Sequence, residues 1–152
     1  MNPEDYKLIP LDEVAADPAL KASYMEMLTQ LYQEYKDAPQ RGRFVLNDIT
    51  EVFHTPDSIE NNFGCYCDFM NYRGKRSGTY HSAIDCVLVN KRKNCIVGEA
   101  GIFIRPYEDQ WGCSGYDVIH PEHRGQGLGK LIMALRMDYA ARVLMPVPCI
   151  FG

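Results

Sequence analysis

A glycine-rich loop is the part of this sequence best suited to bind a phosphate. It contains Gly125, Gly127 and Gly129, and a stretch with apolar residues at helical spacing follows it. Glycine lets the backbone adopt positive φ angles and approach a ligand closely. The first N–H groups of a helix have no partner inside the helix, and with the helix dipole they attract anions. The loop therefore predicts a phosphate site at a helix start, to which Arg124 and Lys130 add positive charge.

The spacing of these glycines excludes two common nucleotide-binding loops. A P-loop requires Gly-x-x-x-x-Gly-Lys-Ser/Thr, which the run from Gly125 to Lys130 does not contain. A dinucleotide-binding loop requires Gly-x-Gly-x-x-Gly early in a βαβ unit. Here the loop lies near the end of the sequence, and Pro146 and Pro148 follow where a further unit would have to begin.

The run Arg-Gly-Gln-Gly-Leu-Gly-Lys, preceded by Ile-His-Pro-Glu-His, closely resembles the motif of the GNAT superfamily of acyl-CoA-dependent N-acetyltransferases. The family pattern is Gln/Arg-x-x-Gly-x-Gly/Ala, and Arg124, Gly127 and Gly129 match it. The specific likeness covers residues 117 to 139, and the expected elements follow the family order from about residue 6 to 150. The resemblance implies an α+β fold (an α/β sandwich), with a central, mostly antiparallel mixed sheet, flanking helices and a minimal C-terminal half.

The same resemblance implies acetyl-CoA as the co-substrate and a set of residues that bind it. Backbone N–H groups of the loop would hold the pyrophosphate, and the preceding strand would present backbone groups to the pantetheine and the thioester carbonyl. The residues in these roles would be Val118, Ile119, Arg124, Gly125, Gln126, Gly127, Leu128, Gly129 and Lys130.

Acetyl transfer also needs a base that accepts a proton from the amine, directly or through water. Asp117 is the first candidate, because it shares a strand face with Ile119; the alternative is an aspartate that is exposed or bonded to the neighbouring strand. Glu99, between two glycines of the preceding strand, is the second; the alternative is a solvent-facing residue. His120 is expected to be a loop histidine, and Cys113 a small core residue rather than a nucleophile.

Elements that would position these residues can be recognised along the chain. We expect strands at Tyr6–Leu11, Ala83–Val89, Cys95–Ile104, Trp111–Ile119 and Val147–Phe151, and helices at 17–36 and 127–143. Gly98 and Gly101 lie inside a strand, where glycine often marks a bulge or a close approach by another group.

Residues 1–152 are predicted to form a single GNAT-like domain with an irregular insertion at about 40–80. Short helices are expected within 47–62 and irregular structure from Phe63 to Tyr80. This insertion would shape the acceptor pocket. Its expected lining residues are Glu60, Tyr66, Asp68 and Tyr72.

Composition limits the function classes. The chain has 152 residues and a formal net charge of −4, which disfavours nonspecific nucleic-acid binding. No stretch reaches the roughly 20 apolar residues that span a bilayer, and the first residues do not resemble a signal peptide, so we expect a cytoplasmic protein without a membrane partner. The 6 cysteines are expected to be reduced, and no metal site is expected.

The leading hypothesis is therefore an acetyl-CoA-dependent N-acetyltransferase, in which a small-molecule or protein amine attacks the thioester in a ternary complex. GNAT enzymes usually continue beyond the motif helix, and a tyrosine there often protonates the leaving thiolate. Tyr139 is not at that position, and the sequence ends at Gly152. This difference favours one of three expectations: a minimal domain, a homodimer or assembly partner that completes the sheet, or a non-catalytic GNAT-fold binding or structural protein.

Overall fold

The computed structural model describes residues 1–38, 53, 55–76, 82–107, 110–144 and 149–151. Its centre is one sheet of five strands in the order β1-β2-β3-β4-β5. Neighbouring strands are antiparallel from β1 to β4, and β5 is parallel to β4. The strands are β1 (Tyr6–Pro10), β2 (Ser82–Asn90), β3 (Cys95–Tyr107), β4 (Gln110–Ile119) and β5 (Cys149–Phe151). The expected α+β fold with a mostly antiparallel mixed sheet is confirmed.

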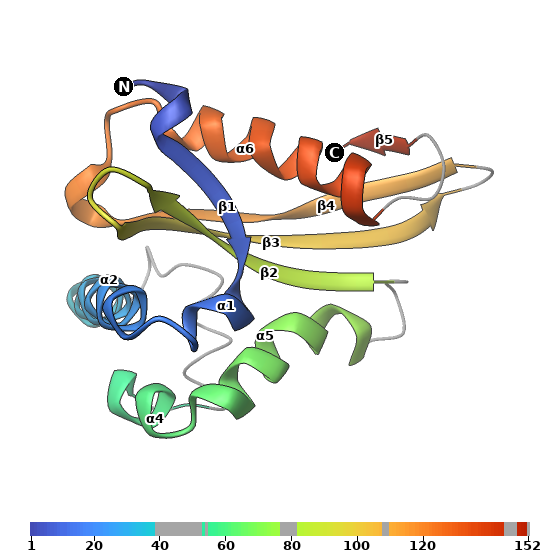
Figure 1. The fold of residues 1–152 in the computed structure, drawn as a ribbon. Coiled ribbons are helices and arrows are strands. Elements are labelled where there is room, and N and C mark those ends of the chain that lie inside the picture. Colours follow the sequence, from blue (N-terminus) through green and yellow to red (C-terminus); the bar gives the residue numbers. More distant parts are fainter. Residues whose placement is uncertain (39–52, 54, 77–81, 108–109, 145–148, 152) are drawn as a thin grey trace.

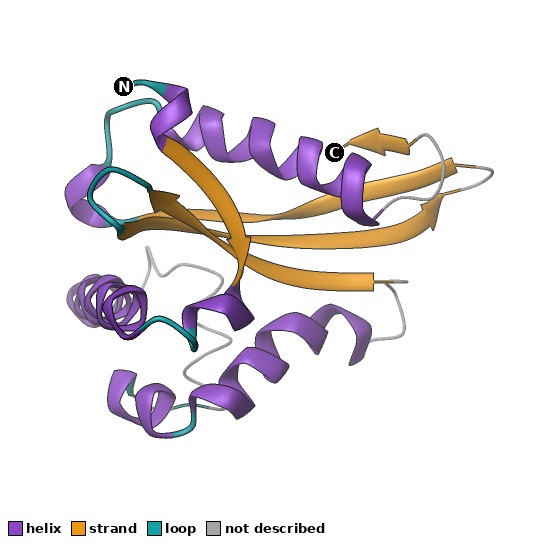
Figure 2. Ribbon diagram, viewed as in Figure 1, coloured by secondary structure: helices purple, strands orange, loops and turns teal. Residues whose placement is uncertain are grey.

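Helices cover both faces of this sheet (Figures 1 and 2). One face carries α6 (Leu128–Tyr139), which continues into the π-helical turn Ala140–Leu144. The helices on the opposite face are α1 (Leu11–Val14), α2 (Pro18–Asp37), α4 (Pro56–Asn61) and α5 (Phe63–Arg76). Two short 3-10 turns, Pro3–Asp5 and η3 (Pro121–His123), complete the described elements.

The start of α2 follows from its first residues. Asp17 accepts hydrogen bonds from the N–H groups of Ala19 and Leu20 at 3.0 and 3.3 Å, and Pro18 occupies the first helical turn. An N-cap side chain of this kind satisfies donors that have no partner in the helix. The predicted helix start at Asp17 is therefore confirmed.

The prediction of irregular structure from Phe63 is wrong for residues 63–76, which form α5. Phe63, Tyr66 and Met70 are buried at helical spacing and pack beneath the sheet with α2. The glycines and aromatics of this segment obscured that period. The short helix predicted from Asn47 falls on 39–52, outside the described residues.

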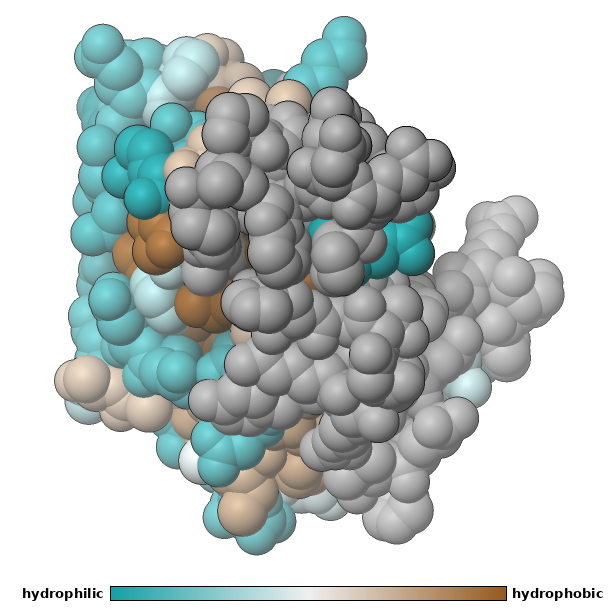
Figure 3. Space-filling view, turned by 90° about the vertical axis from the view of Figure 1, so that its right-hand side faces the viewer, coloured by the Kyte–Doolittle hydropathy of each residue, from teal (hydrophilic) through white to brown (hydrophobic). Residues whose placement is uncertain are grey.

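Two apolar layers hold the sheet. The layer under α2 and α5 includes Leu28, Val87 and Val118, and the layer under α6 includes Val97 and Ile132. On the side that Figure 3 shows, most of the described surface is hydrophilic. Within the described residues, no helix is long and apolar enough to cross a membrane.

The centre of the β3–β4 pair is closely packed around glycine. A Cβ atom at Gly101 would lie 2.1 Å from Cε1 of Tyr116, and one at Gly98 would lie 2.9 Å from the carbonyl oxygen of Val118. The expected close approach at both glycines is confirmed. On β4, a Cβ at Gly115 would lie 1.8 Å from the carbonyl oxygen of Gly101.

Candidate functional site

The loop between β4 and α6 has the backbone that its glycines predicted. Gly125 and Gly127 have φ angles of 79° and 84°, in the left-handed region that favours glycine. Gly127 is the N-cap of α6 and offers no side-chain hydrogen bond. The N–H groups of the first turn of α6 therefore have no cap from this residue and are available to an anion.

Gly129 is a glycine that packing among the described residues does not require. It lies in the first turn of α6, its φ is not in the left-handed region, and beyond its chain neighbours and its own helix backbone a Cβ placed on it would meet no described atom within 4 Å. Glycine in a helix costs about 0.5–1 kcal/mol relative to alanine. The exposed space above Gly129 is therefore best explained by a ligand that approaches the backbone.

The side chain of Arg124 does not point into this space. Its Nη1 and Nη2 donate to Oε2 and Oε1 of Glu34 on α2 at 2.6 and 3.0 Å, and its Nε donates to the carbonyl oxygen of Ile119 at 3.3 Å. The sequence suggested that Arg124 adds positive charge for the ligand, but Glu34 neutralises it. Lys130 and Gln126 are exposed, whereas Leu128, the first residue of α6, is buried against the sheet.

The second half of β4 has an edge that β5 does not cover in the described residues, because β5 pairs with Trp111, Gly112 and Cys113. The N–H of His120 donates to the carbonyl oxygen of Val97 on β3. Backbone groups alternate in direction along a strand. Those of Val118 therefore point toward β3, whereas the N–H groups of Asp117 and Ile119 point toward the uncovered edge.

Glu99 lies on β3 directly opposite Val118 and faces α2 and α5. It is completely buried, so the expectation of a solvent-facing residue is wrong. The hydroxyl of Tyr24 lies 2.9 Å from both carboxylate oxygens and 2.6 Å from the hydroxyl of Tyr66. Tyr24 has one proton, which it donates to Glu99, so the hydroxyl of Tyr66 donates to that of Tyr24. A chain of hydrogen bonds therefore runs from Tyr66 through Tyr24 to Glu99. Burial and the charge of Glu99 raise the pKa of Tyr24 and keep it protonated.

Asp117 faces the opposite side of the sheet. Its Oδ1 accepts a hydrogen bond of 2.7 Å from Nη1 of Arg136 on α6. The partner lies on a helix and not on the neighbouring strand. Burial raises the pKa of Asp117, and the charge of Arg136 counteracts part of the rise. Asp117 and Glu99 therefore lie on adjacent strands but on different faces.

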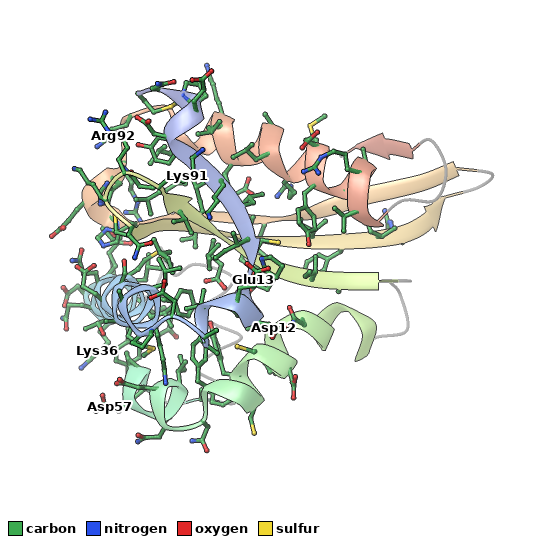
Figure 4. The ribbon with its side chains drawn as sticks, in the orientation of Figure 1. Asp12, Glu13, Lys36, Asp57, Lys91 and Arg92 are labelled. Carbon is green, nitrogen blue, oxygen red and sulfur yellow. The ribbon has the colours of Figure 1, made fainter. Side chains whose placement is uncertain are left out.

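A second buried carboxylate accompanies Glu99, and sequence reasoning missed it. Asp85 on β2 is 1% exposed and accepts a 2.8 Å hydrogen bond from Tyr116. Its N–H donates to Oδ1 of Asn71 on α5. The amide of Asn71 in turn donates to Asp12, which Figure 4 shows on α1 where that helix meets α5. Asp85 lies two residues from Ala83 and from Val87, on the same face of β2, and this spacing gave a signal that it points into a core.

His120 is a loop histidine between β4 and η3, as expected, and it is also buried. It is 2% exposed, its Nδ1 accepts from the N–H of Glu122 at 3.1 Å, and its Nε2 lies 2.8 Å from Oε2 of Glu26. Glu26, His120 and Glu122 are also the group of described residues whose ligand atoms come close enough for a metal ion, within 4.8 Å. Hydrogen bonds already engage both ring nitrogens, which accounts for the group without an ion.

The remaining candidate residues from the sequence differ in burial, and the structure describes only some of their side chains. Of the expected pocket residues, Tyr66 is buried beside Glu99, whereas Glu60 and Asp68 are exposed. The side chains of Tyr72 and Cys113 lie outside the described residues. Cys86 on β2 is fully buried.

Comparisons with known proteins identify the family of this chain. No curated protein matches the sequence. Among solved structures, glucosamine-6-phosphate N-acetyltransferase from Arabidopsis thaliana has 14% identity and a TM-score of 0.48, over 97% of this chain and 81% of that one. An acetyltransferase from Trypanosoma brucei has 21% identity and a TM-score of 0.43, over 90% and 76%. The model of the acetyltransferase (GNAT) family matches residues 25–145, and the chain therefore belongs to that family.

Proposed function

We propose that this protein binds acetyl-CoA at the β4–α6 loop and transfers the acetyl group to an amine. The observation that carries the proposal is Gly129, a glycine in the first turn of α6 with open space above it and no reason in the packing of the residues that the structure describes. GNAT enzymes generally use acetyl-CoA, and a pyrophosphate that rests on the first turn of the helix would account for this glycine.

The coenzyme would contact the chain through its backbone. N–H groups from Arg124 to Lys130 would hold the pyrophosphate, with the ammonium of Lys130 nearby. The N–H groups of Ile119 and Asp117, which face the uncovered edge of β4, would bind the pantetheine and polarise the thioester carbonyl. Because the backbone groups of Val118 point toward β3, this residue would contribute only its side chain to the site, on the α2–α5 side.

Glu99 is the base that we propose, in preference to Asp117. Paired residues on antiparallel strands have Cα atoms about 5.5 Å apart, so Glu99 lies one strand away from the place proposed for the thioester. The amine would reach this place from the α2–α5 side and transfer a proton to Glu99 through water. The neutral nitrogen would then attack the thioester carbonyl. Cleavage of the C–S bond would give the amide, and the second proton of the nitrogen would pass to the departing thiolate of coenzyme A. The acceptor would be a small molecule or a protein amine.

Calorimetry with acetyl-CoA tests the coenzyme site through Gly129→Glu. Glutamate is used instead of alanine because the family pattern accepts alanine at this position. Glutamate should weaken binding by about 100-fold or more, because like charges next to each other cost several kcal/mol. The same change should stabilise the free protein by about 0.5–2 kcal/mol, through helix propensity and the helix dipole.

Gly64→Glu is the matched control. Gly64 is also the second residue of a helix, α5, and outside its own helix backbone no atom of the described part of the chain lies within 4 Å of its Cβ position. This variant should gain stability and keep the affinity of the wild type. Full affinity in Gly129→Glu would show that the site is misplaced.

Catalysis is tested by thiol release from acetyl-CoA across a panel of amines. Glu99→Gln should lower kcat by about 100- to 10,000-fold, the usual contribution of a general base, with the dissociation constant for acetyl-CoA unchanged. Tight binding without thiol release for any amine would favour the non-catalytic alternative. A wild-type pH–rate profile in Glu99→Gln would remove Glu99 as the base.

A further inference from the structure

Helix α2 lies at the same end of the sheet as the loop proposed to bind coenzyme A (Figure 1). The two are joined by the Arg124–Glu34 pair, in which both terminal nitrogens of the guanidinium bind the two oxygens of one carboxylate. The third nitrogen, Nε, binds the carbonyl oxygen of Ile119 at the end of β4. A single side chain thus links the loop, the last residue of β4 and α2.

A second link starts from the same side of α2. Glu26 lies eight residues before Glu34, which is about two helical turns. Because Nδ1 of His120 accepts from the N–H of Glu122, Nε2 carries the ring proton and donates it to Glu26. Gln30, halfway between the two glutamates, donates from its side chain to the other oxygen of Glu26.

We propose that Glu34 and Arg124 are positioning residues that hold the loop in its coenzyme-binding form, and that the guanidinium is not a phosphate ligand. Glu26 and His120 support the same loop at its other end. This inference rests on the proposed function, because it assumes that the loop binds coenzyme A. It differs in assigning a role to α2, outside the matched motif.

The change in coenzyme affinity on removal of Glu34 has opposite signs under charge repulsion and under loop support, so its sign tests the inference. A carboxylate close to an anion site repels the anion, so removal of Glu34 should strengthen coenzyme binding if charge alone mattered. If Glu34 holds the loop, its removal should weaken binding. The alternative role for Arg124, direct contact with phosphate, predicts that loss of Glu34 frees the guanidinium and strengthens binding.

The experiment compares Glu34→Ala, Arg124→Met and the double variant by calorimetry with coenzyme A. Each single variant should weaken binding by about 3- to 10-fold, as expected for a partly exposed bidentate pair. The double variant should be no weaker than the singles, because both remove the same link. KM for acetyl-CoA should rise with kcat unchanged.

Asp37→Ala is the matched control. Asp37 is an exposed acid on the same helix, and its side chain accepts a hydrogen bond from Gln33. It changes the net charge as Glu34→Ala does, and should leave the affinity equal or slightly higher. Unchanged or tighter binding in Glu34→Ala, together with weaker binding in Arg124→Met, would overturn the inference.

A measurement without ligand separates this inference from the proposed function. Hydrogen exchange followed by mass spectrometry should show faster exchange at residues 120–130 in Glu34→Ala, with exchange rates in the sheet unchanged. If the wild type does not bind coenzyme A, the proposed function fails, and the exchange result still decides whether the pair holds the loop. Exchange identical to the wild type would refute it.

Discussion

Asp117 and Glu99 show that a shift of one residue in strand register places a side chain on the other face of the sheet. Both are acids next to the proposed thioester, and the sequence offered both as bases. In the sheet Glu99 lies opposite Val118, whereas Asp117 lies opposite Ala100, one residue out of phase. Because side chains alternate between faces, Glu99 meets Tyr24 of α2 and Asp117 meets Arg136 of α6. The choice between them depends on which face receives the amine.

Asp117→Asn should change the pH dependence of stability. The folded state raises the pKa of Asp117 above its usual 3.8. The folded chain therefore binds this proton more tightly than the unfolded chain does, so ionisation of Asp117 costs stability as the pH rises from 3.8 through the folded pKa. Asparagine cannot ionise but can still accept the hydrogen bond from Arg136.

Urea unfolding of both proteins between about pH 3 and 7 measures the effect. The free energy of unfolding of Asp117→Asn, relative to the wild type, should rise across the window and become constant at neutral pH. A difference that falls with pH would mean that Arg136 outweighs burial. The pH–rate profile of the variant should match the wild type if Glu99 is the base.

At the scale of elements, the β3–β4 pair depends on glycines where the two strands approach closely. Gly115→Ala would place a Cβ 1.8 Å from the carbonyl oxygen of Gly101, so the backbone of one strand would have to move. We expect a loss of about 2–4 kcal/mol in the free energy of unfolding, in the range of severe overpacking. Gly64→Ala, at an open helical position, should not destabilise. A loss below about 1 kcal/mol in Gly115→Ala would show that the strands adjust.

The elements also show where sequence reasoning succeeds. Strands β2, β3 and β4 were recognised because turn residues separate runs that contain β-branched and apolar residues. Helix α2 was recognised because Asp17 and Pro18 mark its start. Helix α5 was missed because its glycines and aromatics are typical of loops, although Phe63, Tyr66 and Met70 keep a helical period. Tertiary burial, which the sequence does not display, decides such a segment.

The site itself was predictable only where its signal is local. Gly125 and Gly127 adopt the left-handed backbone that their spacing indicated. The partners of Arg124 and His120 lie 90 and 94 residues away on α2, and that of Asp117 lies on α6. Such pairs arise from how the helices dock on the sheet, so no short motif could have specified them.

For the whole molecule, α2 connects the two halves of the proposed site. Tyr24 near its start binds the buried Glu99, and Glu34 near its end binds Arg124 of the loop. The coenzyme side and the acceptor side of the sheet therefore share one rigid element. A ligand that binds at the loop should consequently stabilise more of the chain than the residues that touch it.

Coenzyme A should therefore raise the melting temperature of the whole chain. At about 100 times its dissociation constant, a ligand of the folded state adds about 2.7 kcal/mol, which for a domain of this size corresponds to roughly 5–10 °C. Protection from hydrogen exchange should appear at the loop and the start of α6, and also in the second half of α2. In Arg124→Met the α2 protection should disappear while that of α6 remains. Protection of α2 that persists without Arg124 would mean that the sheet core, rather than the Arg124–Glu34 pair, carries the effect across the molecule.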